Sequence, residues 1–203
     1  MRHRFLALGD SYTIGEGVAP GERWPAQLAA RLRSEGIDIA DPQIVATTGW
    51  TTAELAVAMD AAKFKPPYAL VSLLVGVNNQ YRGRGVEEYR AQFRDLLQRA
   101  IGLAGGDAAH VVVVSIPDWG VTPFATREGR DGARVAREID VFNAAAPAEA
   151  TDVGARWLDV TSISRGSGSR AELVDDGLHP SGMQYARWVD AILPVARKIL
   201  LGD

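Results

Sequence analysis

Five short runs of apolar residues, separated by longer amphipathic stretches, constrain the fold of this chain more than any other feature. The runs cover residues 4–8, 43–47, 69–75, 110–116 and 156–160. Two of them contain LVSLLV and VVVVSI, which are apolar at nearly every position and do not alternate with polar residues. Continuous runs of this kind are typical of strands in a parallel sheet, because helices bury both faces of such a sheet. The pattern therefore predicts a five-stranded parallel sheet.

The stretches between the runs predict the helices that cover this sheet. Apolar residues recur at helical spacing over residues 24–34, 53–62, 86–103 and 134–150, and a last helix is predicted from about 181 to 201. Pro147 should end or kink the fourth of these helices, and Pro194 should bend the last, since proline removes a backbone donor and clashes with the preceding turn. Alternating strands and helices predict an α/β fold, a three-layer α/β/α sandwich with right-handed crossovers.

Length and cysteine content limit the domain organisation and the chemistry. The 203 residues fit one large domain, and a core of that size needs no disulfide or metal for stability. The absence of cysteine excludes a thiol nucleophile and a cysteine-based metal site. The first strand leads into GDSYTIGEG, whose glycine spacing fits neither a dinucleotide-binding nor a Walker-type loop. We therefore expect a single catalytic domain over residues 1–203 that does not bind a nucleotide.

Charge and hydropathy argue against nucleic acid and membranes as partners. The net charge is −3, and acidic and basic residues are interspersed. The most basic stretch, residues 127–137, also contains acidic residues, and we interpret it as a solvated helix face. The apolar run at residues 5–8 is too short for a signal peptide, and no stretch approaches the ~20 apolar residues of a membrane span. We expect a soluble, cytoplasmic protein.

A candidate general base follows from the short list of histidines. Ligands of open parallel sheets bind beyond the carboxyl ends of the strands. His3 lies at the N-terminus and His110 opens a strand at the opposite end of the sheet, whereas His179 stands in DDGLHPSG at the start of the last helix. A helix N-terminus disfavours imidazolium, which keeps the ring able to accept a proton. Asp176, three residues earlier, could orient that ring, although an Asp–His pair could also serve only as a helix cap.

Three further strand ends carry groups suited to acyl transfer. Ser11 follows the first strand in LGDSY, where Gly9 permits a tight turn. Gly49 follows the second strand and Asn78 the third. A backbone N–H and an asparagine amide are suitable donors to the oxyanion of an acyl-transfer transition state. Each element alone is also a common turn or cap, but together with His179 they predict a nucleophile, a base and an oxyanion hole.

Ser, Gly, Asn and His in this chain order resemble the GDSL esterase/lipase family, whose members are also called SGNH hydrolases. The first block of the family is matched by GDS at residues 9–11, and the Asp-x-x-His block by DGLH at residues 176–179. The segment SIPDWGVTPFA, residues 115–125, is similar to a segment of bacterial members. The resemblance implies a flavodoxin-like fold with strand order 2-1-3-4-5, and no metal or cofactor.

The resemblance also implies the role of each matching residue. Ser11 corresponds to the nucleophile and to one backbone donor of the oxyanion hole. Gly49 and Asn78 correspond to the other two donors. Asp176 and His179 complete the catalytic triad. The implied activity is hydrolysis of a small carboxylic ester through an acyl-serine intermediate.

Two positions depart from the family pattern. The third block normally reads Gly-x-Asn-Asp, and here Asn79 stands in place of the aspartate. Because that aspartate is not the triad acid, we expect altered local hydrogen bonding and retained activity. The second block lacks the asparagine that often shortly precedes its glycine, so the match of Gly49 to the family glycine has the least support from the sequence.

The substrate is less well defined by the sequence than the reaction. Several aromatic residues lie in or beside loops at the carboxyl end of the sheet, and they could line a substrate pocket or simply pack the loops onto the core: Tyr12, Trp50, Tyr81, Trp119 and Phe124. The long connection at residues 118–132 could cover the site. Short acyl, aryl and acetylated-sugar esters all fit. An acyltransferase with the same acyl-enzyme and a non-catalytic binding module of the same fold are the alternatives.

Overall fold

The computed structural model describes residues 2–166 and 172–202, and its centre is a five-stranded parallel sheet. The strands are β1 (Phe5–Gly9), β2 (Gln43–Ala46), β3 (Leu70–Leu74), β4 (Val111–Val114) and β5 (Arg156–Leu158). Their order is β2-β1-β3-β4-β5, with every pairing parallel. The α/β fold and the strand order 2-1-3-4-5 are thus confirmed.

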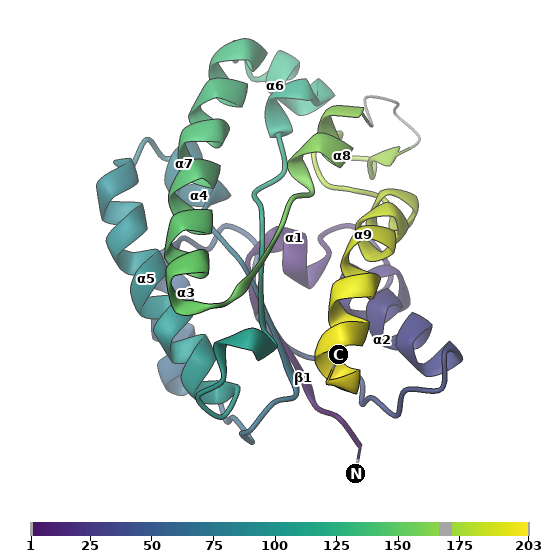
Figure 1. Ribbon diagram of the computed structural model, residues 1–203. Coiled ribbons are helices and arrows are strands. Elements are labelled where there is room, and N and C mark those ends of the chain that lie inside the picture. The colour runs from purple at the N-terminus through teal and green to yellow at the C-terminus, as the bar shows by residue number, and fades with distance from the viewer. Residues whose placement is uncertain (1, 167–171, 203) are drawn as a thin grey trace.

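Helices cover both faces of the sheet (Figure 1). Figure 1 shows α2 (Trp24–Ser34) and α9 (Gly182–Leu201) on one side, and α3 (Thr52–Ala61), α5 (Val86–Leu103) and α7 (Gly132–Val153) on the other. The remaining helical segments are short: α1 (Ser11–Ile14), α4 (Val77–Tyr81), α6 (Pro123–Arg127), α8 (Thr161–Gly166), η1 (Pro20–Glu22), η2 (Ala108–His110) and η3 (Trp119–Val121). No helix of the described ranges is long and apolar enough to cross a membrane.

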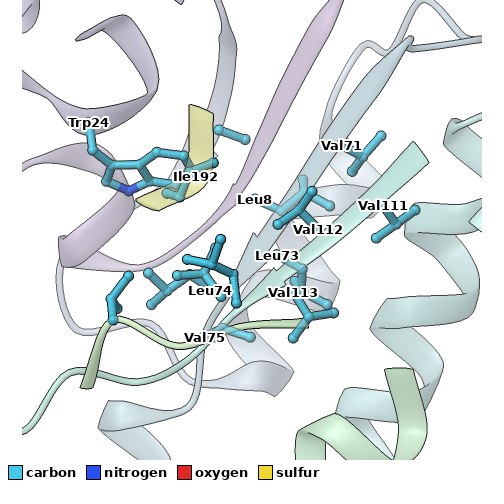
Figure 2. Close-up of a cluster of buried hydrophobic side chains, with 14 of the residues drawn as sticks. Leu8, Trp24, Val71, Leu73, Leu74, Val75, Val111, Val112, Val113 and Ile192 are labelled. Atoms are coloured by element: carbon cyan, nitrogen blue, oxygen red, sulfur yellow. The ribbon is translucent and has the colours of Figure 1, made fainter. Parts of the chain in front are cut away.

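The core lies along the three central strands. Every residue of β1, β3 and β4 is buried, whereas the edge strands β2 and β5 are partly exposed. Figure 2 shows Leu8, Leu73 and Val113 on these neighbouring strands, with side chains from α2 and α9 such as Trp24 and Ile192 in the same cluster. Burying one such side chain contributes about 1.5–3 kcal/mol. The apolar runs are therefore what holds the sheet between its helices.

Strand register determines where the site forms. Gly9 at the end of β1 lies beside Ala46 of β2 and Leu74 of β3. The residues that follow these three strands therefore emerge side by side at one edge of the sheet. This register brings the three loops that begin at residues 10, 47 and 75 to a common place.

The structure differs from the sequence predictions at several connections. Residues 165 and 166 belong to a Gly- and Ser-rich stretch, 165–170, of a kind typical of surface loops, yet they end α8; residues 167–170 lie outside the described residues. The basic stretch 127–137 is not one solvated helix face, because Arg127 ends α6 and α7 begins only at Gly132. The predicted long loop 118–132 contains η3 and α6.

Both prolines lie inside continuous helices. Pro147 does not end α7, and Pro194 stands within α9. Beyond Pro147, the buried Glu149 accepts hydrogen bonds from Arg90 and Arg94 of α5. These contacts hold the last turns of α7 against α5, which offsets the hydrogen bond that proline removes. The helix ends at Gly154, whose φ of 84° suits glycine.

Candidate active site

The first strand turns directly into α1, and this turn places Ser11. A Cβ on Gly9 would lie 2.2 Å from Thr13 Oγ1 and 2.4 Å from the Leu74 carbonyl oxygen, so no larger residue fits there. Asp10 caps α1 by accepting a hydrogen bond from Tyr12 N at 3.1 Å. Ser11 is the first residue of α1 and is 5% exposed. Its hydroxyl therefore lies at the carboxyl end of the central strand, with its backbone N–H at a helix N-terminus.

Asp176 and His179 form a hydrogen-bonded pair just before α9. Asp176 Oδ2 lies 2.6 Å from His179 Nδ1. The other carboxylate oxygen accepts hydrogen bonds from Leu178 N at 2.7 Å and His179 N at 3.0 Å. Burial raises the pKa of Asp176, but the hydrogen bonds from His179 and Leu178 outweigh it, so that the pKa is lowered overall. The carboxylate thus stays charged and orients the buried imidazole ring of His179.

Ser11 and His179 line the same pocket. The ring of Tyr12 packs near that of His179, with the ring centroids 5.5 Å apart, and so supports the imidazole from α1, the helix that begins at Ser11. Among the described residues, no hydrogen bond joins Ser11 Oγ to His179. Catalytic hydrogen bonds are often long in free enzymes and shorten when substrate binds. Ser11 and His179 therefore line one pocket, and the hydrogen bond between Ser11 Oγ and His179 is expected to form only when substrate binds.

The second and third loops bring two hydrogen-bond donors to this pocket. Gly49 lines it with a φ of 87°, a left-handed conformation that glycine adopts without strain. Asn78 also lines it, and its Nδ2 donates one hydrogen bond to the Trp50 carbonyl at 2.9 Å. An amide nitrogen carries two hydrogens, so a second donor remains on Asn78. The bond to Trp50 fixes the amide and ties the two loops together.

Arg82 holds the Gly49 loop from outside the pocket. Its Nη2 donates to the Gly49 carbonyl at 2.5 Å, and its Nη1 lies 3.3 Å from the Glu54 carboxylate. Glu54 in turn accepts a hydrogen bond from Thr51 N at 2.7 Å, in a capping box at the start of α3. The peptide that follows Gly49 is therefore held in one orientation by a charged side chain. Sequence reasoning did not identify Arg82, since nothing in the sequence indicates which carbonyl an arginine will reach.

Asn79, which replaces the family aspartate, is fully buried and contacts Thr52 twice. Its Oδ1 accepts a hydrogen bond from Thr52 N at 3.0 Å, and its Nδ2 donates to Thr52 Oγ1 at 2.7 Å. The Thr52 hydroxyl then donates to Gln92 of α5. An aspartate could accept from Thr52 but could not donate to it, so the asparagine reverses one hydrogen bond. The Asn79 side chain thus holds the start of α3 beside the site, while Asn78 and not Asn79 lines the pocket.

The pocket is small and mainly apolar. Its volume is about 170 Å³, and its lining comprises Ser11, Tyr12, Thr48, Gly49, Val77, Asn78, Tyr81, Trp119, Phe124, Leu178 and His179. The rings of Tyr81 and Trp119 are 5.4 Å apart, and those of Trp119 and Phe124 are 6.1 Å apart. Four of the five aromatic residues singled out from the sequence thus lie in this wall. Trp50 lies outside it and packs against the core.

Helix α6 connects the pocket wall to the Asp–His turn. Phe124 N donates to the Gly177 carbonyl at 3.0 Å, while its ring lines the pocket. Arg127 Nη2 donates to the Asp176 carbonyl at 2.7 Å, and the Arg127 guanidinium lies 5.5 Å from the Phe124 ring centroid. Arg127 was missed by sequence reasoning, because its place in a basic stretch favoured a solvated position. The turn that carries Asp176 and His179 is therefore supported by α6.

The two other histidines lie away from this site. His3 and His110 line a separate cavity together with Arg2 and Arg4 of the N-terminal strand region. Within residues 2–166 and 172–202, no group of three or more His, Asp or Glu side chains is arranged to hold a metal ion. The chemistry that the described site offers is that of a serine, a histidine and hydrogen-bond donors.

Comparison with known proteins places this arrangement in a family. The fold and the site define an α/β protein with a serine and an Asp–His pair at the carboxyl edge of its sheet. The family model described as the GDSL-like lipase/acylhydrolase family matches residues 7–187, and the chain belongs to that family. The family consists of enzymes that act on esters. No curated protein matches the chain.

Several solved structures have the same fold as this chain over nearly its whole length. A crystal structure of TesA is 23% identical, with a TM-score of 0.74, and the match covers 97% of this chain and 99% of that chain. The psychrotrophic esterase EstA from Pseudoalteromonas sp. is 18% identical, with a TM-score of 0.75 and coverage of 99% and 100%. Axe2, an acetylxylan esterase from Geobacillus stearothermophilus, is 18% identical, with a TM-score of 0.73 and coverage of 96% and 94%. At these identities the likeness establishes the fold alone.

Proposed function

We propose that this chain is a serine esterase that hydrolyses small carboxylic esters through an acyl-serine intermediate. The observation that carries the proposal is that Ser11, Gly49, Asn78 and His179 line one pocket, although they come from four separate segments: α1, the loop after β2, α4 and the turn before α9. The hydrogen bond between His179 and Asp176 adds the orienting carboxylate that a serine–histidine pair requires. We also propose that residues 1–203 form a single catalytic domain, because the family match extends over residues 7–187.

In the first half of the reaction, Ser11 Oγ attacks the ester carbonyl carbon while His179 takes the hydroxyl proton. The carbonyl oxygen becomes an oxyanion, which accepts hydrogen bonds from Ser11 N, Gly49 N and the Asn78 amide. The ester C–O bond then breaks, and the alcohol leaves with the proton that His179 returns. Water repeats the sequence on the acyl-enzyme, releasing the carboxylic acid and restoring Ser11. Asp176 stays ionised and stabilises the imidazolium of each step.

The pocket favours short acyl groups. Its volume of about 170 Å³ is below the roughly 300–1,000 Å³ that pockets for drug-sized ligands occupy. The aromatic wall formed by Tyr81, Trp119 and Phe124 limits its depth. Gln80 fixes this wall, since its Oε1 accepts a hydrogen bond from Trp119 Nε1 at 2.8 Å. We therefore expect acetyl and butyryl esters to be better substrates than octanoyl esters.

Hydrolysis of p-nitrophenyl esters from acetate to octanoate would test the proposal. Wild type should hydrolyse the short esters, and Ser11→Ala should lower turnover on the order of 10⁶-fold, as loss of a triad nucleophile does. Ser34→Ala, at the exposed end of α2, is a matched control that should retain full activity. Equal rates for wild type and Ser11→Ala would remove Ser11 as nucleophile. Product analysis with added alcohol would separate hydrolysis from acyl transfer.

A further inference from the structure

A second, larger cavity adjoins the small pocket. Its volume is about 610 Å³, and Tyr81 lines both cavities. One wall of the larger cavity comes from the end of α4 and the turn at Gly83 and Arg84, and the other from residues 129–131 and the first turns of α7. An ester bound at Ser11 has two parts, and the small pocket accommodates only one of them. The larger cavity is the adjacent space for the other.

Three arginines line this larger cavity, and one of them lacks an acidic partner. Arg134 pairs with Glu138 at 2.8 Å, and Arg84 pairs with Glu88 at 3.0 Å. Arg130 makes no ion pair with the described residues, and its guanidinium lies 5.2 Å from the centroid of the Tyr81 ring. The charge of Arg130 is thus placed at the ring of Tyr81, which lines both cavities.

The acidic residues of the cavity are already engaged with other groups. The Asp131 carboxylate caps α7 and accepts hydrogen bonds from Ala133 N at 3.0 Å and Arg134 N at 3.2 Å. Glu138 accepts hydrogen bonds from Gln80 Nε2 at 2.7 Å and Arg134 Nε at 2.8 Å. These contacts hold both carboxylates in place within the fold. The lining residues of the cavity comprise three arginines and two carboxylates, so the lining carries a net positive charge beside the active site.

We propose that this cavity binds an anionic group on the alcohol part of the substrate, with Arg130 as its principal partner. The proposal rests on the esterase function proposed above and narrows its substrate class to esters whose alcohol carries a carboxylate or a phosphate. Arginine presents several donors in a plane that matches either anion. The acyl group occupies the apolar pocket, and the alcohol extends past Tyr81 to the guanidinium of Arg130. Hydrolysis then releases an anionic alcohol.

A pair of acetate esters tests this assignment: 4-acetoxybenzoate, whose leaving alcohol is anionic, and methyl 4-acetoxybenzoate, whose leaving alcohol is neutral. The measured quantity is the ratio of the two kcat/KM values, which cancels changes that affect both esters. Arg130→Gln should lower the ratio by about tenfold, as expected for loss of one partly exposed charge contact. Arg137→Gln, an exposed arginine of α7 that does not line the cavity, is the matched control and should leave the ratio unchanged.

Two comparisons identify which anion is bound, a phosphate or a carboxylate, and which part of the ester carries it, the alcohol or the acyl group. 4-Acetoxyphenyl phosphate against its neutral dimethyl ester, a phosphate triester, distinguishes a phosphate from a carboxylate, and a loss of preference for either anion in Arg130→Gln supports the proposal. p-Nitrophenyl hydrogen succinate carries the anion on the acyl part. A preference for that ester that depends on Arg130 would overturn the placement on the alcohol side. A ratio that is the same in wild type and Arg130→Gln for both anions would overturn the proposal altogether.

A binding measurement separates this proposal from the esterase function. Ligand-observed NMR would compare 4-hydroxybenzoate with neutral 4-hydroxybenzamide, neither of which contains an ester bond, so that binding is measured without turnover. Tighter binding of the acid to wild type, lost in Arg130→Gln and kept in Arg137→Gln, supports the anion site even for a chain that hydrolyses neither acetate. Hydrolysis of both esters by wild type without such a difference in binding leaves the esterase standing and contradicts the anion site.

Discussion

Asp10 should make the stability of this protein fall as pH rises towards neutrality. The side chain is fully buried, Oδ1 accepts a hydrogen bond from Tyr12 N, and Oδ2 has no partner among the described residues. Burial raises the pKa of Asp10 from 3.8 to about 7, although hydrogen bonds from the backbone of Tyr12 and Gly76 act in the opposite direction. An unfolded chain releases this proton near pH 4. Between about pH 4 and 7 the folded state therefore binds one proton more than the unfolded state.

The magnitude follows from this difference. Stability changes by about 1.4 kcal/mol for each pH unit over which one proton separates the two states. The stability that the protonated carboxyl provides is fully present below pH 4 and is lost as pH rises to about 7. Between pH 5 and pH 8 the loss amounts to about 3 kcal/mol. This is a large part of the 5–15 kcal/mol by which proteins are typically stable.

Asp10→Asn is the variant that isolates this effect. Asparagine has nearly the same shape, can accept the hydrogen bond from Tyr12 N and carries no charge at any of these pH values. Its free energy of unfolding, relative to wild type, should rise by about 3 kcal/mol between pH 5 and pH 8. Urea unfolding followed by tryptophan fluorescence at pH 5, 6, 7 and 8 measures this difference.

A surface aspartate provides the control for Asp10→Asn. Asp95→Asn removes a carboxylate from the exposed side of α5, and its difference from wild type should stay within about 0.5 kcal/mol at every pH. A difference between Asp10→Asn and wild type that is constant within the same limit would refute the reasoning. It would mean that Asp10 is ionised in the folded state at pH 5.

Three further variants test other contacts of the site and fold. Asn78→Ala should lower kcat by about 10²–10³, the cost of one oxyanion donor, and a fall of less than tenfold would contradict that role. Arg82→Met should lower kcat about tenfold with little change in KM, because it releases the peptide that follows Gly49. Steady-state kinetics that show a raised KM and an unchanged kcat would contradict this, since loss of substrate binding alone has that effect. Hydrogen bonds from Arg94 lower the pKa of Glu149 to about 2; burial opposes this shift, and the hydrogen bond from Arg90 adds to it. Glu149→Gln removes the negative charge and so weakens these hydrogen bonds. We expect the variant to lose about 1–3 kcal/mol at pH 7, and wild type to lose the same contribution as pH falls from 4.5 towards 2; urea unfolding that shows neither would exclude it.

The sheet could be predicted from the sequence because its strands are buried on both faces. The runs at residues 69–75 and 110–116 contain β3 and β4, whose described residues are all buried, so hydrophobic pattern and strand coincide there. The continuation of α7 past Pro147 could not be predicted in this way. It depends on ion pairs between Glu149 and the arginines of α5, which lie more than fifty residues away in sequence. Local propensity is overridden by such tertiary contacts.

The sequence predicts those residues of the candidate site that lie near the end of a strand. Ser11, Gly49 and Asn78 come within four residues of the ends of β1, β2 and β3, and parallel strands place such residues at one edge. The direction of an aromatic side chain in a loop could not be predicted from the sequence, because the loop can point that side chain either to the core or to the pocket. Trp50 and Phe124 illustrate this, since only the latter lines the pocket. The roles of long side chains such as Arg82 depend on contacts across loops, which spacing in the sequence does not encode.

The two hydrogen bonds from α6 to the Asp–His turn have a consequence for any change in substrate range. Phe124 forms part of the pocket wall, and its own backbone N–H donates to the carbonyl of Gly177, which lies between Asp176 and His179, the proposed catalytic pair. Enlarging the pocket by displacing α6 would therefore also move the base, so that broader specificity would come with slower proton transfer. Divergence at this wall should proceed by exchange of the Phe124 side chain on a fixed backbone, because that route alters the pocket and leaves the base in place.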